Sequence, residues 1–350
     1  MLLLLLICSM ILTSCNQEKY NELEKSLDDF FTNNKLGFSG SVLIASDGKI
    51  ILKKGYGMAD YEKQIPNTPE TVFKIGSVTK QFTSMAIMML EERGLLSVND
   101  PVKKYIPDFS QGDKITIHHL LSMTSGIGDY IRDDWEACER NYTVEELLTK
   151  INKKPGSFEA GSKYEYSNSS YVILGYIIEK VSGMEYGEFL KQNIFDPLDM
   201  KNSAYDFKED LLANKARGYV NVADINKNNA VLAQNMNMSY AYSTGGLYST
   251  VEDLYKWDQA LYTEKLVKKA SLVKLFTPNI DNYGYGWDIL TRYKNTISHD
   301  GRCRGFTSII YRFMDKKTTI IILMNEEDMY GFGKIIKGML EIAEKYEILT

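Results

Sequence analysis

Stretches typical of β-strands lie near both ends of this 350-residue chain, whereas the region between them shows mainly helical patterns. Near the start, residues 41–45 and 50–52 are apolar runs on either side of Asp47-Gly48, a pair that favours a tight hairpin turn. Strands are predicted at four places near the end: 285–290, 296–299, 306–313 and 318–324. The sequence therefore predicts an α+β fold in which early and late strands share one antiparallel β-sheet flanked by helices.

Several predicted helices have clear start or stop signals. Residues 81–90 form an apolar run that ends near Gly94, a typical residue just past a helix end. Further helices are expected to begin at the capping residues Thr116, Thr143 and Thr250. These signals place most of the helices in the middle of the chain.

We therefore expect an all-helical lobe, at about 100–239, inserted into an α/β lobe made of about 38–99 and 240–350. A final amphipathic helix is predicted over 334–346. A chain of this length can bury a large core, and a cleft between two lobes is a usual place for a ligand site.

The amino terminus is predicted to be a targeting segment. Its apolar run, 2–12, is shorter than the roughly 20 residues that a membrane-spanning helix needs, and it leads into Leu12-Thr13-Ser14-Cys15. This ending resembles the lipobox of bacterial lipoproteins. The resemblance implies a signal peptide of residues 1–14, a lipid-modified Cys15, and a tether with the first helix at 15–37.

A lipid anchor implies a membrane partner and a place in the bacterial cell envelope, on the periplasmic or extracellular side. One feature departs from the pattern, because no Lys or Arg precedes the apolar run. The alternative is a signal anchor that is not cleaved.

Composition narrows the other classes of partner. The net charge of −5 argues against a nucleic-acid partner. The chain has three histidines and none of the usual zinc-ligand spacings, so we expect no metal and no cofactor. Cys138 and Cys303 lie too far apart in sequence to suggest a disulfide framework.

The leading candidate for chemistry is Ser77-Val78-Thr79-Lys80, which precedes the predicted 81–90 helix. Residues three apart share a helix face, so the Lys80 amine can reach the Ser77 hydroxyl. A serine hydroxyl becomes a good nucleophile when a neighbouring base takes its proton, and burial lowers the pKa of a lysine towards that role. The alternative is that Ser77 only caps the helix.

The same spacing occurs twice more, so the motif alone is weak evidence. Ser46-Asp47-Gly48-Lys49 falls in the hairpin turn, and Ser271-Leu272-Val273-Lys274 falls in a short helical segment that Thr277-Pro278 ends. Ser77 alone among the three serines opens a long apolar helix, and this context favours it.

Two further motifs follow Ser77 in order. Tyr166-Ser167-Asn168 lies in a loop that enters a buried helix, and His299-Asp300-Gly301 lies at the end of a predicted strand. Ser-x-x-Lys, Tyr-Ser-Asn and His-x-Gly in this order resemble the serine β-lactamase and penicillin-binding-protein superfamily, in its class C-like branch. The resemblance covers most of the chain from about Phe38 onward, and three flanking segments agree with it: 115–126, 195–200 and 245–250.

The resemblance implies a β-lactamase/transpeptidase-like fold and a serine hydrolase that cleaves an ester or amide through an acyl-enzyme, without a cofactor. It makes Ser77 the nucleophile and makes Lys80 and Tyr166 the proton carriers. Which of these two acts as the general base stays open. Asn168 would hold Lys80 and the substrate.

The same resemblance implies the rest of the site. His299 would begin the strand that lines the cleft. The backbone N–H groups of Ser77 and Arg302 would form the oxyanion hole, and Gly301 would let the acyl group approach the strand.

Two departures from the family pattern concern the substrate. Many β-lactamases and transpeptidases have a lysine in place of His299, so a carboxylate-bearing substrate is less strongly implied. Arg302 or Arg304 can supply the missing positive charge, and the alternative is that both are solvated surface residues. Met123 replaces a histidine that is common in the family's Thr-Ser-Gly loop, which predicts an altered pocket wall. The substrate, a small molecule or a peptide, stays open between esters, D-amino-acid peptides and β-lactams.

Two other functions remain as alternatives. Cys303, between two arginines, can be the nucleophile of a cysteine-dependent enzyme. The chain can also be a non-catalytic envelope lipoprotein that binds a peptide or cell-wall ligand on the same scaffold. His118 and His119 are interpreted as structural residues.

Overall fold

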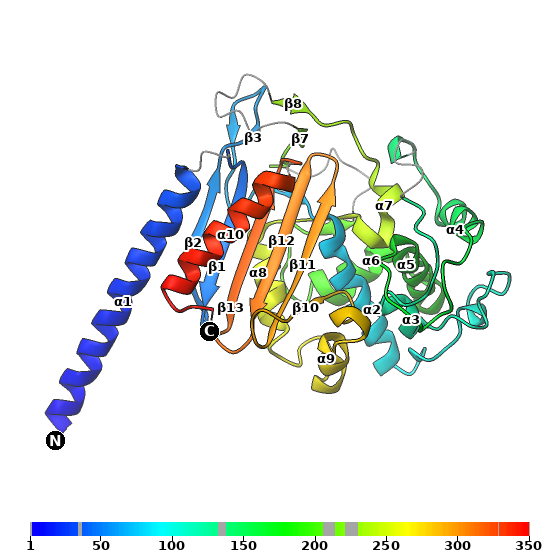
Figure 1. Cartoon of the computed structure of the whole chain (residues 1–350), viewed down its shortest axis with the longest axis horizontal. Helices are drawn as coiled ribbons and strands as arrows, with labels where there is room; N and C mark the ends of the chain where they lie inside the picture. Colours follow the sequence, from blue (N-terminus) through cyan, green and yellow to red (C-terminus); the bar gives the residue numbers. More distant parts are fainter. Residues whose placement is uncertain are drawn as a thin grey trace.

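The chain forms one antiparallel sheet that joins its early and late segments, as the sequence predicts. The computed structural model describes residues 2–33, 37–131, 138–205, 214–220, 230–327 and 329–349, with the side chains of 2–16, 329 and 330 outside the description. The strand order is β10-β11-β12-β13-β1-β2, and every neighbouring pair is antiparallel (Figure 1). The strands are β1 (Gly40–Ser46), β2 (Lys49–Tyr56), β10 (Asp288–Leu290), β11 (Thr296–Cys303), β12 (Phe306–Phe313) and β13 (Thr318–Met324).

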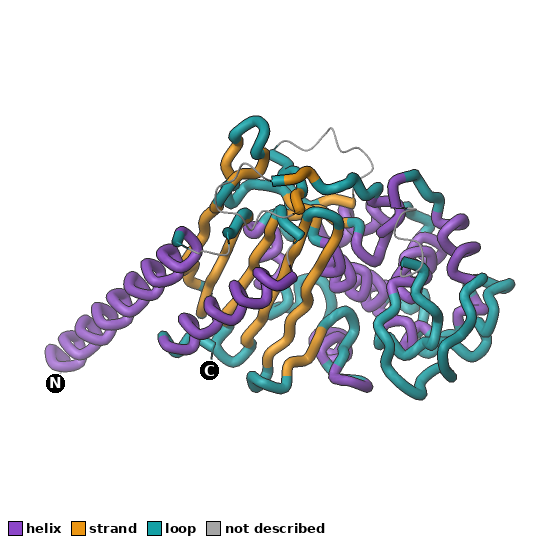
Figure 2. The backbone as a smooth tube through the Cα atoms, turned by 45° about the horizontal axis from the view of Figure 1, so that its top comes forward, coloured by secondary structure: helices purple, strands orange, loops and turns teal. Residues whose placement is uncertain are grey.

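Helices surround this sheet and fill the middle of the chain. The α-helices are α1 (Leu2–Thr32), α2 (Thr79–Glu92), α3 (Ile117–Leu121), α4 (Val144–Asn152), α5 (Asn168–Ser182), α6 (Tyr186–Leu190), α7 (Met238–Gly245), α8 (Val251–Ala260), α9 (Lys269–Phe276) and α10 (Met329–Lys345). Shorter helical turns are η1 (Gly76–Val78), η2 (Val102–Lys104), η4 (Lys191–Phe195) and η6 (Ile280–Asn282). Short strands are β3 (Met58–Asp60), β4 (Ile65–Pro66), β5 (Phe73–Lys74), β6 (Ala204–Tyr205), β7 (Tyr219–Val220), β8 (Val231–Leu232) and β9 (Leu247–Ser249). In Figure 2 the helices between the early and late strands gather at one side of the sheet.

The two faces of the sheet pack into two separate cores because side chains alternate along each strand. On β1, Val42 and Ile44 join one core, whereas Leu43 and Ala45 join the other. We call the core under α1 and α10 the outer core, and the core that contains α2, α5 and α8 the inner core. This separation places every helix of the candidate site on the inner face.

Helix α1 is part of the outer core from its middle onward. Leu23, Leu27 and Phe31 are buried, and their spacing of four residues puts them on one face of the helix. The expected lipidation site, Cys15, lies in the part of α1 whose side chains are outside the description. Among the described residues, no helix has the length and apolar character needed to cross a membrane.

The capping predictions are confirmed. The side chains of Thr116, Thr143 and Thr250 accept backbone N–H bonds at the starts of α3, α4 and α8. Gly94 follows α2 with a φ of +70°, which glycine adopts without strain. One boundary differs, because Ser77 lies in the 3₁₀ turn η1 and the α-helix begins two residues later.

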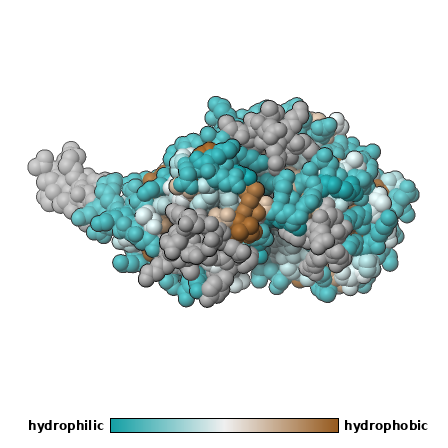
Figure 3. Space-filling view, turned by 90° about the horizontal axis from the view of Figure 1, so that it is seen from above, coloured by the Kyte–Doolittle hydropathy of each residue, from teal (hydrophilic) through white to brown (hydrophobic). Residues whose placement is uncertain are grey.

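The exterior is predominantly hydrophilic in the view from above, with one small apolar cluster near its centre (Figure 3). The large apolar side chains that are exposed come from several separate segments: Ile50, Ile65, Leu95, Val231, Leu232, Val273 and Ile280. Scattered exposure of this kind is normal, so it does not by itself mark a partner surface.

Candidate active site

Ser77 and Lys80 lie where η1 meets α2, on the inner face of the sheet. Ser77 is partly exposed, whereas Lys80 is fully buried. The Lys80 Nζ lies 2.9 Å from the Ser77 Oγ. The predicted contact between the two side chains is therefore present, although it crosses from a 3₁₀ turn into an α-helix.

The Lys80 amine has two other partners, and both are fixed acceptors. Its Nζ donates to the Asn168 Oδ1 at 2.9 Å and to the Thr244 backbone carbonyl at 2.8 Å. A neutral amine has two N–H bonds and one lone pair. If these two acceptors take the N–H bonds, the lone pair is left facing the Ser77 hydroxyl, which is the arrangement a general base needs.

Burial makes the neutral form of Lys80 accessible near neutral pH. Desolvation lowers the pKa of Lys80 to about 7, and the negative charges of Asp129 and Asp300 oppose that shift. The rings of Tyr166 and Tyr171 lie 4.8 Å and 5.6 Å from the Nζ and favour the charged form weakly. Burial is the largest of these effects.

Tyr166 contributes a second hydroxyl at the same point. Its phenol is hydrogen-bonded to Ser77, and burial raises its pKa well above the usual value. A phenol of this kind keeps its proton at neutral pH. Tyr166 is therefore placed to pass a proton, whereas Lys80 is the group that can be without one.

Asn168 is the first residue of α5 and links several elements of the site. Its Oδ1 accepts from Lys80 and from the Thr244 Oγ1 at 2.7 Å, and its Nδ2 donates to Asp129 at 2.9 Å. The Tyr-Ser-Asn loop thus enters the buried helix as predicted, and its asparagine reaches the Lys80 amine.

The predicted oxyanion donors lie close together because two glycines let η1 approach β11. A side chain at Gly76 would come within 2.5 Å of the Arg302 backbone nitrogen, and one at Gly301 within 2.9 Å of the Ser77 nitrogen. The tightest contact at Gly301 is with the Ile75 carbonyl, at 2.0 Å. Gly301 is therefore required for the packing of η1 on β11, which differs from the predicted reason that it leaves room for an acyl group.

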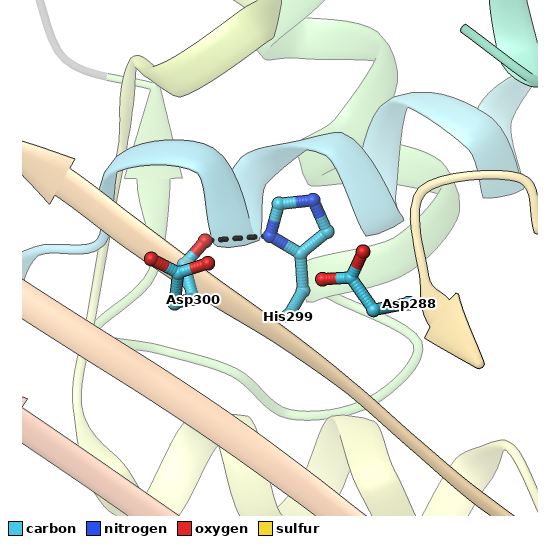
Figure 4. A group of neighbouring side chains, drawn as sticks. All are labelled: Asp288, His299 and Asp300. Carbon is cyan, nitrogen blue, oxygen red and sulfur yellow. Dashed lines mark hydrogen bonds between the residues drawn. The ribbon is translucent and has the colours of Figure 1, made fainter. Parts of the chain in front are cut away.

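His299 lies within β11 rather than at the end of a strand, because the ladder with β12 continues to Cys303. Its Nδ1–H donates to the Asp300 carbonyl at 2.5 Å, and its Nε2 lies 3.1 Å from the Tyr283 hydroxyl (Figure 4). This pattern uses both ring nitrogens of a neutral imidazole. The ring lies beside Tyr166, with the ring centres 6.3 Å apart.

Two carboxylates flank His299. Ligand atoms of Asp288, His299 and Asp300 lie within 4.8 Å of one another, so these residues could hold a metal ion. Figure 4 shows the Asp288 carboxylate on one side of the imidazole and Asp300 on the other. Burial raises the pKa of Asp288, and the Asp300 charge raises it further. The group around His299 is therefore acidic, where the family often has a lysine.

The two arginines after Gly301 take different places. Arg302 lies on the acidic group, with its guanidinium 3.1 Å from the Asp300 carboxylate, and both side chains are well exposed. Arg304 lines a cavity of about 330 Å³ together with Lys74, Lys215 and Arg217. Arg302 is thus engaged with a carboxylate of the chain itself.

The remaining sequence interpretations concern support around the site. Met123 is buried, and its sulfur accepts the Ser167 N–H at 3.3 Å, so it forms the wall beneath the Tyr-Ser-Asn loop. His118 contacts the Tyr285 hydroxyl at 2.6 Å, and His119 takes part in the α3 capping box. Both histidines are structural, as interpreted.

The alternative nucleophiles lie elsewhere or are unreactive. Cys303 is buried, and desolvation raises the pKa of its thiol to about 12, which leaves almost no thiolate at neutral pH. The Ser46 hydroxyl contacts Thr318 in the hairpin region, and the Ser271 hydroxyl donates to Glu92. Neither of these serines contacts its motif lysine in the hydrogen bonds of the described residues.

Sequence reasoning missed three contributors to the site. Asp129 and Thr244 act on Asn168 and Lys80 from distant segments, and Asp288 joins His299 from β10. Asp129 follows the Thr-Ser-Gly loop in sequence, and that position was the available signal. A backbone carbonyl such as that of Thr244 leaves no signal in residue type.

Comparison with known proteins agrees with this geometry. Residues 33–336 match the family model described as Beta-lactamase. Penicillin-binding protein PbpX of Bacillus subtilis (strain 168) is 34% identical over 292 residues, which cover 83% of this chain and 71% of that protein. Teichoic acid D-alanine hydrolase of Staphylococcus aureus (strain MRSA252) is 30% identical over 76% of this chain and 63% of its own length.

A solved structure shows the same fold. The octameric penicillin-binding protein homologue from Pyrococcus abyssi superposes with a TM-score of 0.77 and 31% identity, over 92% of this chain and 77% of that one. The fold, the family match and the relatives agree, and the chain therefore belongs to the β-lactamase-like family of serine hydrolases.

Proposed function

We propose that this protein is a serine hydrolase in which Ser77 forms an acyl-enzyme with an ester or amide of a D-amino acid. The carrying observation is the buried Lys80 amine, held by Asn168 and Thr244 and directed at the Ser77 hydroxyl. Fold membership alone does not supply an activity, whereas this convergence of groups is specific to acyl transfer.

The acylation step follows from the placement of these groups. As the Ser77 oxygen bonds to the substrate carbonyl carbon, its proton passes to Lys80, and the carbonyl oxygen becomes an oxyanion facing the N–H groups of Ser77 and Arg302. The tetrahedral centre then collapses, the bond to the leaving group breaks, and the leaving group takes a proton through Tyr166. Lys80 restores the Tyr166 proton.

Deacylation uses the same groups in reverse order. Water gives a proton to the Lys80–Tyr166 pair as its oxygen bonds to the acyl carbon. The ester bond to Ser77 then breaks, and the serine oxygen recovers a proton from Lys80. No redox step or external co-reactant other than water is needed, and acid and base roles are exchanged within one pair of side chains.

Two observations support a substrate with a positively charged amine. One relative is named a teichoic acid D-alanine hydrolase. In this chain, Asp288 and Asp300 flank the neutral His299 beside Tyr166. An acidic group at this point attracts an ammonium group and repels a carboxylate. This favours a D-alanyl ester or amide with a free amine over a peptide with a terminal carboxylate.

Intact-mass measurement of the protein with a substrate panel tests the proposal. We expect an alanyl adduct on Ser77 with a D-alanyl ester, and much less with the L-alanyl ester or the N-acetylated D-alanyl ester. Ser77→Ala gives the background. Equal turnover of the free and N-acetylated esters would exclude a role for the amine.

A non-catalytic ligand-binding protein on this scaffold is the second candidate. It predicts that a fluorophosphonate probe and a fluorescent penicillin both fail to label Ser77 in the folded protein. Labelling by either reagent that is lost in Ser77→Ala excludes this candidate.

We also propose that Cys15 is lipid-modified and anchors the protein to the membrane of the bacterial cell envelope. The support comes from the sequence alone, namely the short apolar run before Leu12-Thr13-Ser14-Cys15. The expected result is membrane fractionation and palmitate labelling of the full chain in a bacterial host. Release into the soluble fraction in Cys15→Ala supports the anchor, and unchanged fractionation contradicts it.

A further inference from the structure

We propose that Asp129 is a positioning residue that fixes the orientation of the Asn168 side chain and thereby directs the Lys80 lone pair at Ser77. This inference rests on the proposed function, since it concerns how Lys80 takes the Ser77 proton. Asp129 belongs to the segment after the Thr-Ser-Gly loop and is nine-tenths buried.

The hydrogen bonds of Asp129 favour one orientation of the asparagine amide. Its Oδ2 accepts from the Asn168 Nδ2 at 2.9 Å and from the Asn168 backbone N–H at 3.2 Å. An ionised carboxylate only accepts hydrogen bonds, so the NH₂ end of the amide must face Asp129. The carbonyl end then faces Lys80 and Thr244.

The alternative orientation would be unfavourable on both sides. It would place the Asn168 oxygen against the Asp129 carboxylate and the NH₂ group against the Lys80 amine. Lys80 would lose an acceptor, and its lone pair would turn from Ser77 towards the amide. The orientation of Asn168 therefore decides which neighbour of Lys80 can receive its lone pair.

Asp129 is itself held by the start of α5 and by its own loop. Its Oδ1 accepts the Ile131 N–H at 2.9 Å. Ser167 is the N-cap residue of α5, but its hydroxyl donates to the Ile127 carbonyl at 3.0 Å. Asp129 therefore supplies a negative group at this helix start, where a carboxylate is favoured.

The charge of Asp129 adds a second effect on Lys80. Asp129 and Asp300 are the carboxylates that raise the pKa of Lys80 against desolvation, and the rings of Tyr166 and Tyr171 face the same amine. Asp300 is paired with Arg302, whereas Asp129 contacts the Lys80 partner directly. Removing the Asp129 charge lowers the pKa of Lys80, so the neutral amine persists to lower pH.

The experiment compares Asp129→Asn and Asp129→Ala by the rate of Ser77 labelling with a fluorophosphonate between pH 5 and 9. Asp129→Asn can still accept from Asn168 but has no charge. We expect its plateau rate to stay within about threefold of the wild type and the acid limb of its pH profile to move to lower pH. For Asp129→Ala we expect a plateau roughly 10- to 100-fold lower, because the amide orientation is released.

Asp60→Asn is the matched control. Asp60 is another buried carboxylate that accepts two backbone N–H bonds, in the turn between β3 and β4, and it does not act on the Lys80 pKa. Its pH profile should match the wild type. A probe also separates the two hypotheses, because failure to label wild-type Ser77 contradicts the proposed function itself.

Two results would overturn the role of Asp129. One is an unchanged profile and plateau in both Asp129 variants. The other is a plateau that falls equally in both variants with an unmoved acid limb, which indicates general loss of structure. Thermal unfolding of each variant is measured in parallel, and if Asp129→Ala does not fold, the limb of Asp129→Asn decides.

Discussion

The outer face of the sheet is covered by α1 and α10 through apolar side chains, whereas the inner face carries buried polar and charged groups as well. On α1, the packed residues are Leu23, Leu27 and Phe31. On α2, the buried residues include Lys80, Gln81, Thr83 and Ser84. Since burying polar groups costs free energy unless each finds a partner, the inner face is where a selected function is expected.

Each buried polar group on the inner face has identifiable partners. Thr83 donates to the Ser243 carbonyl at 2.7 Å, and the Gln81 amide oxygen accepts from Trp257 at 2.9 Å. Helix α7 supplies carbonyls to both Thr83 and Lys80, and it contains Tyr242 at the unusual backbone angles φ +42° and ψ −132°. Strain of this kind is maintained only where surrounding packing holds it, often beside a functional site.

The largest effect is expected on the inner face at Ser77. Ser77→Ala should lower acyl transfer by about 10⁴- to 10⁶-fold, because nucleophile and base act as one unit. Labelling by a fluorophosphonate measures it. Ser46→Ala and Ser271→Ala are matched controls from the other Ser-x-x-Lys segments, and loss of labelling in either one with retention in Ser77→Ala would refute the assignment.

The next effect is expected where the inner face meets β11. Gly301→Ala places a Cβ 2.0 Å from the Ile75 carbonyl, so η1 must move away from the strand. We expect a loss of roughly 100- to 1,000-fold in kcat, the usual result of displacing an oxyanion donor. Steady-state kinetics with the preferred ester measures it, and an unchanged kcat would show that the two backbone donors are not used.

The outer face should respond in stability rather than chemistry. Leu27→Ala leaves a cavity in the outer core and should lower the free energy of unfolding by about 2–5 kcal/mol. Denaturant unfolding measures this change. Glu24→Ala, on the exposed side of the same helix, is the control, and a shift in the pH profile of folded Leu27→Ala would break the separation between the faces.

The smallest effect is expected on α10. Gly333 lies in this helix, and a Cβ there meets nothing within 4 Å. Gly333→Ala should therefore stabilise the protein by about 0.5–1 kcal/mol through helix propensity, with unchanged kcat. Thermal unfolding measures the gain, and destabilisation would contradict the open surroundings of this position.

The same contrast separates what the sequence could predict from what it could not. Strands β1, β12 and β13 follow from apolar alternation, and the caps of α3, α4 and α8 follow from threonine chemistry, because both depend on neighbouring residues. Ser77, Lys80, Tyr166 and Asn168 were found through ordered motifs, and the structure brings these four side chains together.

Contacts between distant segments left no comparable signal. Asp129 and Asn168 are 39 positions apart, and Lys80 and Thr244 are 164 positions apart. The continuation of β11 through Gly301 to Cys303 was also missed, because Arg302 and Gly301 interrupt the apolar pattern although the β12 ladder holds them in the strand. Pairing with a neighbour, rather than local preference, decides such residues.

The pH dependence of Ser77 acylation tests the central claim most directly, since the claim is that neutral Lys80 takes the serine proton. The pKa of Lys80 is lowered to about 7 by burial, so the charged form predominates below that pH. The account predicts that the rate of fluorophosphonate labelling rises about tenfold per pH unit below 7 and levels off above it. A rate that is constant from pH 5 to pH 9 in correctly folded protein would contradict the account.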